Sequence, residues 1–222
     1  MSDVTIIGMP RSSLTRAVRI ACLEKEIAFE FSSRNIQPPG HPPTPELLHN
    51  NPFGKVPVLI HGAFVLYETA AICRYIDDNF SGPLLRPVSA QKVARMNQWI
   101  SLAMTRLDQN IIRNFVIPMV FADESQRHDP GFAVAMNQMA DIIRDDLSVL
   151  NTAYHEGWLC GAHFTIPDMM IMPMLHYLDA MPGGPEMLAN APNIKDAFAR
   201  FKARSSAART DPLLPEKLLK TA

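Results

Sequence analysis

The segment 82–87 (Gly-Pro-Leu-Leu-Arg-Pro) interrupts every periodic pattern in the chain and separates two differently patterned parts. Before it, short β-rich runs alternate with helical patterns, and after it every long segment has helical spacing. The length of 222 residues exceeds the usual size of one domain, roughly 100–200 residues. We therefore predict a first domain over residues 1–82, a linker over 83–88 and an all-helical second domain over 89–222.

The first half of the first domain begins with a strand and a helix. Val4–Ile7 is a short β-rich run, and apolar residues follow it at the helical positions 14, 18, 21 and 22. Ala28–Phe31 can form a second strand. Pro38–Pro45 is so rich in proline that neither a helix nor a central strand can form, and we predict a loop there.

The second half of the first domain carries a hairpin followed by a helix. Val58–Ile60 and Phe64–Leu66 are joined through His61-Gly62, where glycine allows the positive φ of a tight turn. Thr69 is expected to cap a helix whose inward residues are Ala70, Ile72, Cys73 and Ile76. The order β-α-β-loop-β-β-α is the thioredoxin-like order of elements.

The second domain is predicted to be a helical bundle. Ala90–Phe115 and Phe132–Tyr154 both carry apolar residues in helical register. A further helix carries Met169, Met170, Met172 and Met174, which we expect to fill irregular space in the core rather than bind metal. The basic residues Arg200, Lys202, Arg204 and Arg209 lie near a helix end, where the dipole favours them, and are expected to be solvated.

Charge and histidine spacing limit the partners. A formal net charge of -1 gives no field that would attract nucleic acid or an anionic membrane, so small molecules or proteins are favoured. The seven histidines lack the i, i+3 or i, i+4 spacing of helical metal ligands, and no metal is predicted.

Cysteine usage and apolar run lengths indicate a cytoplasmic protein. The three cysteines, Cys22, Cys73 and Cys160, are far apart and lie in apolar helical patterns, so we expect them to be reduced and buried. The first residues lack the pattern of a signal peptide, and no apolar run approaches the roughly 18–20 residues of a membrane span.

The strongest local motif is residues 51–58 (Asn-Pro-Phe-Gly-Lys-Val-Pro-Val), where a turn leads directly into a buried strand. A cis bond before Pro57 would hold the main-chain groups of Val56 outward, toward an extended peptide. An ordinary loop with two prolines explains the same residues equally well when they are taken alone.

Two helix starts in the first domain can serve a ligand. Glu68 and Thr69 precede the third helical pattern, where free N–H groups attract a carboxylate and Glu68 can hold an ammonium group. Ser12 and Ser13 lie between the first strand and the first helix, and a hydroxyl there can stabilise a thiolate by donating to sulfur. Simple helix capping accounts for either pair by itself.

These three motifs occur in one order within one unit, and the chain resembles the glutathione transferase family over almost its whole length. The resemblance is closest to the phi class in residues 8–12 (Gly-Met-Pro-Arg-Ser) and in 51–58, while 12–21 (Ser-Ser-Leu-Thr-Arg-Ala-Val-Arg-Ile-Ala) is also similar to the zeta class. It implies a serine-type, bacterial-type cytosolic transferase fold: an α/β thioredoxin-like domain (βαβαββα) followed by an all-α bundle.

The resemblance also implies roles for particular residues. Both classes use a serine that maps to Ser12, with Ser13 beside it as a second candidate for contacting the thiol. Val56 and Pro57 are expected to bind the cysteinyl part of glutathione. Lys55 and His41 are expected at its glycine carboxylate, and Glu68 and Thr69 at its γ-glutamyl end.

Further residues match family features outside the glutathione site. Residues 158–168 resemble the family's carboxy-domain motif, in which Thr165 and Asp168 have the spacing of a capping box and a structural role. Phe53 occupies the position of an aromatic residue that inserts into a partner subunit in several members, with local core packing as the alternative.

The function implied is transfer of glutathione, as co-substrate, to small hydrophobic electrophiles by a detoxifying cytoplasmic homodimer. Four residues are candidates for the electrophile pocket or, alternatively, for the bundle core: Met104, Phe115, Met119 and Phe121. Three other functions remain open: a zeta-like cis-trans isomerase, weakened by Leu14 where zeta enzymes carry cysteine; a glutathione peroxidase or dehalogenase; and a non-catalytic binding protein of the same fold.

Overall fold

The computed structural model describes residues 3–37 and 40–212 as two compact units. One unit comprises the described residues up to Pro87 together with 204–212, and the other comprises 88–203. The predictions made for residues 1–2, for the first two prolines of the loop at 38–39, and for 213–222 lie outside the described residues.

The first unit is built on a four-stranded mixed sheet with the order β2-β1-β3-β4. Its strands are β1 (Val4–Ile7), β2 (Glu30–Ser32), β3 (Val58–His61) and β4 (Phe64–Tyr67). β1 runs parallel to β2 and antiparallel to β3, and β3 forms a hairpin with β4. Gly62 has a φ of 57° in the two-residue turn of this hairpin, which explains why glycine is needed there.

The helices of the first unit are α1 (Ser13–Glu24), α2 (Pro45–Asn50), α3 (Thr69–Asn79) and α11 (Ser205–Arg209). They confirm the thioredoxin-like order β-α-β-α-β-β-α, which the resemblance implied. The residue patterns alone predicted only a loop before β3. α2 begins at the end of that loop because Thr44 caps it by accepting a bond from the Leu47 amide, while Pro45 occupies its first turn.

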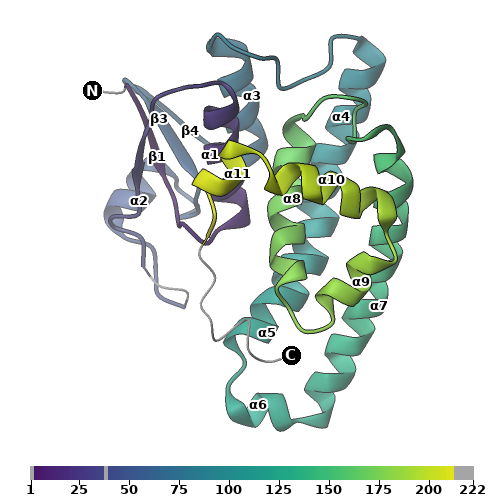
Figure 1. The fold of residues 1–222 in the computed structure, drawn as a ribbon. Coiled ribbons are helices and arrows are strands. Elements are labelled where there is room, and N and C mark those ends of the chain that lie inside the picture. The colour runs from purple at the N-terminus through teal and green to yellow at the C-terminus, as the bar shows by residue number, and fades with distance from the viewer. Residues whose placement is uncertain (1–2, 38–39, 213–222) are drawn as a thin grey trace. The chain divides into compact units, whose positions relative to one another are not determined.

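The core of the first unit lies where α1 and α3 pack against each other beside the sheet (Figure 1). The side chains buried there come from both helices and both central strands, and include Ile6, Val18, Ile20, Cys22, Val58, Leu59, Ile72, Cys73 and Ile76. Lys25 and Asp77 form a buried ion pair of 3.1 Å between the end of α1 and α3. Asp77 also accepts a bond of 2.8 Å from the Leu85 amide, so it holds the segment that follows α3.

The carboxyl-terminal helix α11 belongs to the first unit and packs on α1. Arg204, which precedes it, donates two hydrogen bonds to the Glu24 carboxylate. Burial raises the pKa of Glu24, but the bonds from Arg204 and Ser206 outweigh this effect and the pKa is lowered. The prediction that the basic run is solvated is therefore wrong for Arg204, whose side chain is half-buried. Arg200 is exposed, as predicted, while it donates to the Gly157 oxygen and lies over the Trp158 ring.

The second unit is entirely helical over its described residues, as predicted. Its helices are α4 (Ala90–Leu102), η1 (Ala103–Val116), α5 (Ile117–Phe121), α6 (Glu124–His128), α7 (Pro130–Ala153), η2 (Tyr154–Glu156), α8 (Ile166–Asp179), α9 (Gly184–Ala189) and α10 (Pro192–Lys202). The predicted helix over 90–115 continues from α4 into η1, which is a π-helix. Two hydrogen-bonded side-chain pairs, Asp108–Arg113 and Gln109–Asn114, have the five-residue spacing that suits this wider helix.

The buried helix α8 forms the centre of the second unit, and its four methionines are fully buried, as predicted. The capping box at its start is confirmed, since the Asp168 carboxylate accepts bonds from the Thr165 amide at 2.9 Å and hydroxyl at 2.8 Å. It also accepts a bond from the Leu159 amide at 3.1 Å, so the preceding loop is fixed to the helix. Desolvation by burial nevertheless raises the pKa of Asp168 to about 6.

Candidate active site

The predicted ligand-binding segments lie at one end of the sheet. Val58 of β3 pairs with Ile7 of β1 on one side and with Tyr67 of β4 on the other, so the three residues form one row across the sheet. The chain leaves β1 after Ile7, enters β3 at Val58 and leaves β4 after Tyr67. Because neighbouring strands are separated by about 4.8 Å, the segments that carry Ser12, Val56 and Glu68 all adjoin this short row.

Ser12 is the N-cap of α1. Its Oγ accepts a hydrogen bond of 3.2 Å from the Thr15 amide, and its side chain is half-buried. A hydroxyl group has one hydrogen and two acceptor lone pairs, so the capping bond leaves the hydrogen of Ser12 available for donation. Ser13, the first residue of the helix, is only 5% exposed. This difference in exposure favours Ser12 over Ser13 as the hydroxyl that reaches a ligand.

The first turn of α1 is packed closely against the end of β1. A Cβ atom on Gly8 would lie 2.3 Å from Cγ2 of Thr15, so only glycine fits at that position. The Gly8 amide donates to the Ser32 oxygen at 2.9 Å, which fixes the chain as it leaves the sheet. Residues 8–12 therefore follow a defined path to the Ser12 hydroxyl.

The loop before β3 contains the cis peptide bond between Val56 and Pro57 that the sequence suggested. The main chain of Val56 makes no hydrogen bond with any part of the chain that the structure describes. Its amide and carbonyl groups therefore retain their capacity to pair with an added strand, in the manner of an extended peptide at a sheet edge.

Asn51 organises this loop, and the sequence analysis assigned it no role. Its Nδ2 donates to the Lys55 oxygen at 2.8 Å, and its Oδ1 accepts from the Phe53 amide at 3.0 Å. Its main-chain oxygen accepts from the Gly54 amide at 2.8 Å. The side chain is buried, and its hydrogen bonds hold the turn from the inside. The preference of asparagine for such turns was the signal that could have identified it.

Glu68 has a φ of 74° and a ψ of 115°, an unusual conformation for a residue with a side chain. It is the N-cap residue of α3, and its side chain is exposed. The prediction that Thr69 caps the helix is wrong, because Thr69 is the first helical residue and is buried. Strained residues of this kind cluster at ligand-binding positions, since the surrounding structure must hold them in place.

Two helix amino termini face this end of the sheet: that of α1, and that of α3, whose N-cap residue Glu68 makes no side-chain capping bond. Neither α1 nor α3 has an acidic residue in its first turn. The positive ends of their dipoles are therefore available to an anion, such as a thiolate at α1 or a carboxylate at α3.

The structure gives the other predicted site residues a position and an exposure. Lys55 is exposed, and Pro57 is buried at the start of β3. His41 is exposed after the turn at Gly40 and makes no hydrogen bond with a described residue. The structure thus brings the Ser12, Val56 and Glu68 segments to one end of the sheet, but it assigns no contact to His41.

The protein's own thiols are unsuited to act as nucleophiles. Cys22 and Cys73 are buried, as predicted, and burial raises the pKa of Cys22 to about 12 and raises that of Cys73 further. Cys160 is only half-buried, contrary to the prediction, yet burial still raises its pKa. A thiolate at this site would therefore have to come from a ligand.

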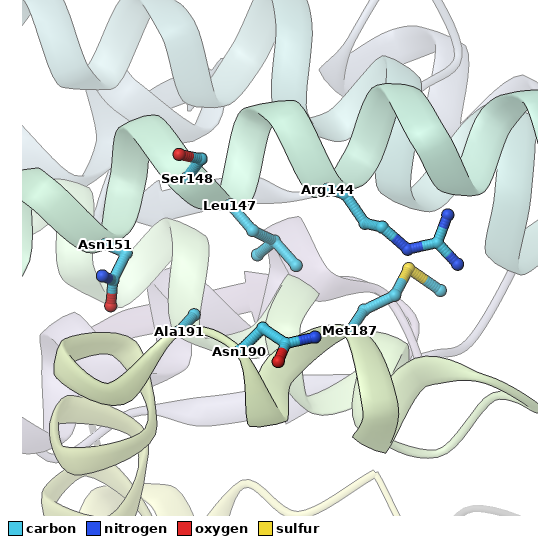
Figure 2. A pocket seen from close by; sticks show the side chains of 7 residues that line it. All are labelled: Arg144, Leu147, Ser148, Asn151, Met187, Asn190 and Ala191. Atoms are coloured by element: carbon cyan, nitrogen blue, oxygen red, sulfur yellow. The ribbon is translucent and has the colours of Figure 1, made fainter.

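The second unit has a pocket of about 270 Å³ between α7 and α9 (Figure 2). Its lining is mixed, with the Arg144 guanidinium and the Asn190 amide beside the apolar Leu147 and Met187. None of the predicted electrophile-pocket residues lines it. Of those residues, Phe115 is buried in the bundle, whereas Phe121 is 64% exposed and so is not a core residue.

The fold and the site define a two-unit protein whose thioredoxin-like unit presents an open main-chain edge and two helix amino termini to a ligand. Comparison with known proteins assigns the family. Residues 6–84 match the model of the glutathione S-transferase N-terminal domain, and residues 133–203 match that of the C-terminal domain. The chain therefore belongs to the glutathione S-transferase family of enzymes.

Individual relatives agree over nearly the whole chain. Glutathione S-transferase F6 of Arabidopsis thaliana is 27% identical over 215 residues, which cover 93% of this chain and 98% of that protein. Glutathione S-transferase 3 of Zea mays is 26% identical over 223 residues, which cover 97% of this chain and 96% of that one.

Solved structures show the same fold. The apo form of glutathione S-transferase III is similar with a TM-score of 0.77 and 26% identity, covering 96% of this chain and 98% of that chain. A theta class glutathione S-transferase from Xanthomonas axonopodis pv. citri, solved with glutathione bound, has a TM-score of 0.78 and 23% identity, covering 97% of this chain and 99% of that chain.

Proposed function

We propose that this protein transfers glutathione to small hydrophobic electrophiles and that the Ser12 hydroxyl stabilises the glutathione thiolate. The observation that carries the proposal is the position of Ser12: it caps α1 through its lone pair, keeps its hydrogen for donation and stands at the positive end of the helix dipole. Hydrogen bonding to the ionised form lowers the pKa of a thiol. The serine itself need not lose its proton.

The rest of the peptide would bind along the same end of the sheet. The free amide and carbonyl of Val56, beside Pro57, would pair with the cysteinyl main chain. Glu68 would hold the ammonium group of the γ-glutamyl end, while Thr69 and the start of α3 would bind its carboxylate. Lys55 is exposed and free to approach the glycine carboxylate, with His41 as a second cation on the preceding loop.

The reaction then needs only the bound thiolate and an electrophile held in line with it. The thiol proton is released to solvent, the sulfur lone pair forms a bond to the electrophilic carbon, and the leaving group departs with the electrons of its own bond. The Ser12 hydrogen bond lowers the energy of the thiolate, and an apolar pocket in the helical unit would hold the electrophile. Isomerisation and peroxide reduction would use the same thiolate.

We also propose that the protein is a cytoplasmic homodimer. Phe53 is 69% exposed and contacts the Tyr67 ring only by its edge, with ring centroids 6.1 Å apart. Such an exposed aromatic ring supports insertion into a partner subunit rather than local core packing. A mass in solution equal to that of one chain at all concentrations would contradict the dimer.

The test is to measure glutathione binding by calorimetry and conjugation to an aromatic electrophile for the wild type, Ser12→Ala and Ser13→Ala. We expect Ser12→Ala to lose turnover by about a hundredfold while it keeps its affinity for glutathione, and Ser13→Ala to stay close to wild type. A peroxide and an unsaturated dicarboxylate serve as alternative substrates. If the wild type binds no glutathione, the non-catalytic interpretation of the fold replaces this proposal.

A further inference from the structure

The first turn of α1 carries both Ser12 and a buried arginine. The Arg16 amide donates to the Ser12 oxygen at 2.9 Å, which is the first main-chain bond of the helix, and the Thr15 amide donates to the Ser12 Oγ. Arg16 is only 1% exposed, an unusual state for an arginine side chain. Any displacement of Arg16 would therefore move the turn from which the Ser12 hydroxyl projects.

The Arg16 side chain is anchored in the carboxyl-terminal segment of the same unit. Its Nε donates to Oγ1 of Thr210 at 3.2 Å, and one of its terminal nitrogens donates to the Ala207 oxygen at 3.1 Å. Thr210 is fully buried, and its hydroxyl donates in turn to the Ser206 oxygen at 2.7 Å. The planar guanidinium thus bridges α1 and α11 through two bonds of fixed direction.

A second anchor joins the same two helices at the opposite end of α1. Arg204 and Ser206 donate to the Glu24 carboxylate, with a distance of 2.8 Å from the Arg204 Nε. Arg16 and Glu24 are eight residues apart, so these anchors are separated by about 12 Å along the helix. Only the Arg16 anchor lies in the turn that carries Ser12.

We infer that Arg16, held by Thr210 and the Ala207 carbonyl, is a positioning residue that fixes the Ser12 hydroxyl through the first turn of α1. The carboxyl-terminal segment 204–211 thereby takes part in the thiol chemistry of the thioredoxin-like unit without touching the substrate. This inference rests on the proposed role of Ser12. Its physical basis is that terminal helix turns fray, while a hydrogen bond to a thiolate loses its effect when the donor is misplaced by a fraction of an ångström.

The test compares Thr210→Val, which removes the acceptor of the Arg16 Nε with little change of shape, with Thr210→Ser, which keeps it. Glu24→Gln is the matched control, because it weakens the other anchor of the same helix. For each variant we would measure kcat, the dissociation constant of glutathione and the pKa of the bound thiol from thiolate absorbance. Melting temperatures report the loss of stability separately.

For Thr210→Val we expect kcat to fall about tenfold and the pKa of the bound thiol to rise by about half a unit, with glutathione affinity within about twofold of wild type. Thr210→Ser should restore both values, and Glu24→Gln should lower the melting temperature without moving the thiol pKa. If Thr210→Val does not fold, Arg16→Lys replaces it, with the same expected shift. Equal kinetic losses in Thr210→Val and Glu24→Gln, or an unchanged thiol pKa, would overturn the inference.

Ser12→Ala separates this failure from failure of the proposed function. If Ser12→Ala loses turnover and Thr210→Val does not, only the positioning role of Arg16 is wrong. If Ser12→Ala matches wild type in turnover and thiol pKa, the serine mechanism itself is wrong.

Discussion

The side-chain amide of Asn51 donates a hydrogen bond of 2.8 Å to the main-chain oxygen of Lys55, the residue just before Val56. Asn51→Ala removes this bond and the one from the Phe53 amide, so the loop that presents Val56 should lose its fixed path. We expect the KM for glutathione to rise by about five- to tenfold, equivalent to roughly one net hydrogen bond. Asn51→Asp keeps the acceptor for Phe53 and should show a smaller rise; an unchanged KM in Asn51→Ala would contradict this role.

Glu68 combines a strained backbone with a side chain expected to bind the ligand. Glu68→Gly should raise the free energy of unfolding by about 1 kcal/mol, because glycine adopts a φ of 74° without steric cost. The same change removes the carboxylate and should weaken glutathione binding about tenfold. Glu68→Ala loses the carboxylate but keeps the strain, so it should weaken binding without stabilising the fold. Urea unfolding measures the effect on stability, and calorimetry measures the effect on glutathione binding. A Glu68→Gly protein that is less stable than wild type would show that the backbone of Glu68 is not strained.

The ion pair of Lys25 and Asp77 is buried on both sides, with exposed side-chain fractions of 1% and 0%. Asp77→Asn leaves the Lys25 ammonium in a dry site without its counter-charge, and we expect the free energy of unfolding to fall by about 3 kcal/mol. Asp78→Asn is the control, since Asp78 is 54% exposed and its bond to Arg86 lies at the surface. That control should cost less than about 1 kcal/mol. Equal losses in urea unfolding would contradict the account.

The buried Asp168 carboxyl makes stability depend on pH. Its pKa is raised by burial from 3.8 to about 6, so between these values the folded state binds more protons than the unfolded state. The contribution of Asp168 therefore favours the fold below pH 4 and is lost as the pH rises toward 6, on the order of 2–3 kcal/mol in total. The difference in unfolding free energy between wild type and Asp168→Asn should follow this curve. A difference that is constant from pH 4 to 7 would show that Asp168 does not titrate there.

Local sequence patterns predicted the first strand and the break between the two differently patterned parts of the chain. Val4–Ile7 matches β1, and the break at 82–87 falls where the sheet-containing segment ends. The π-helix η1 was not predicted, because apolar spacing in this segment is compatible with an ordinary helix. α2 was missed by the residue patterns, since the prolines of residues 38–45 indicated only a loop, although Pro45 occupies the first turn of α2.

Long-range pairs could not be predicted from sequence. Arg204 looked like a solvated residue near a helix end, yet its partner Glu24 lies 180 residues away. No local pattern records such a pair, and the same holds for Arg16 and Thr210, which are separated by 194 residues. The candidate site was predictable in outline because each of its segments lies next to a strand end. For Asn51 the sequence carried only the preference of asparagine for turns, and not the two side-chain bonds that define its role.

The most direct test of the central claim is a titration of the glutathione thiol bound to wild type and to Ser12→Ala, followed through the absorbance of the thiolate. The account predicts a pKa well below that of free glutathione in the wild type and a pKa about one to two units higher in Ser12→Ala, with the same dissociation constant. Ser13→Ala should titrate like wild type. If Ser12→Ala binds glutathione and its thiol ionises as it does in wild type, Ser12 does not stabilise the thiolate.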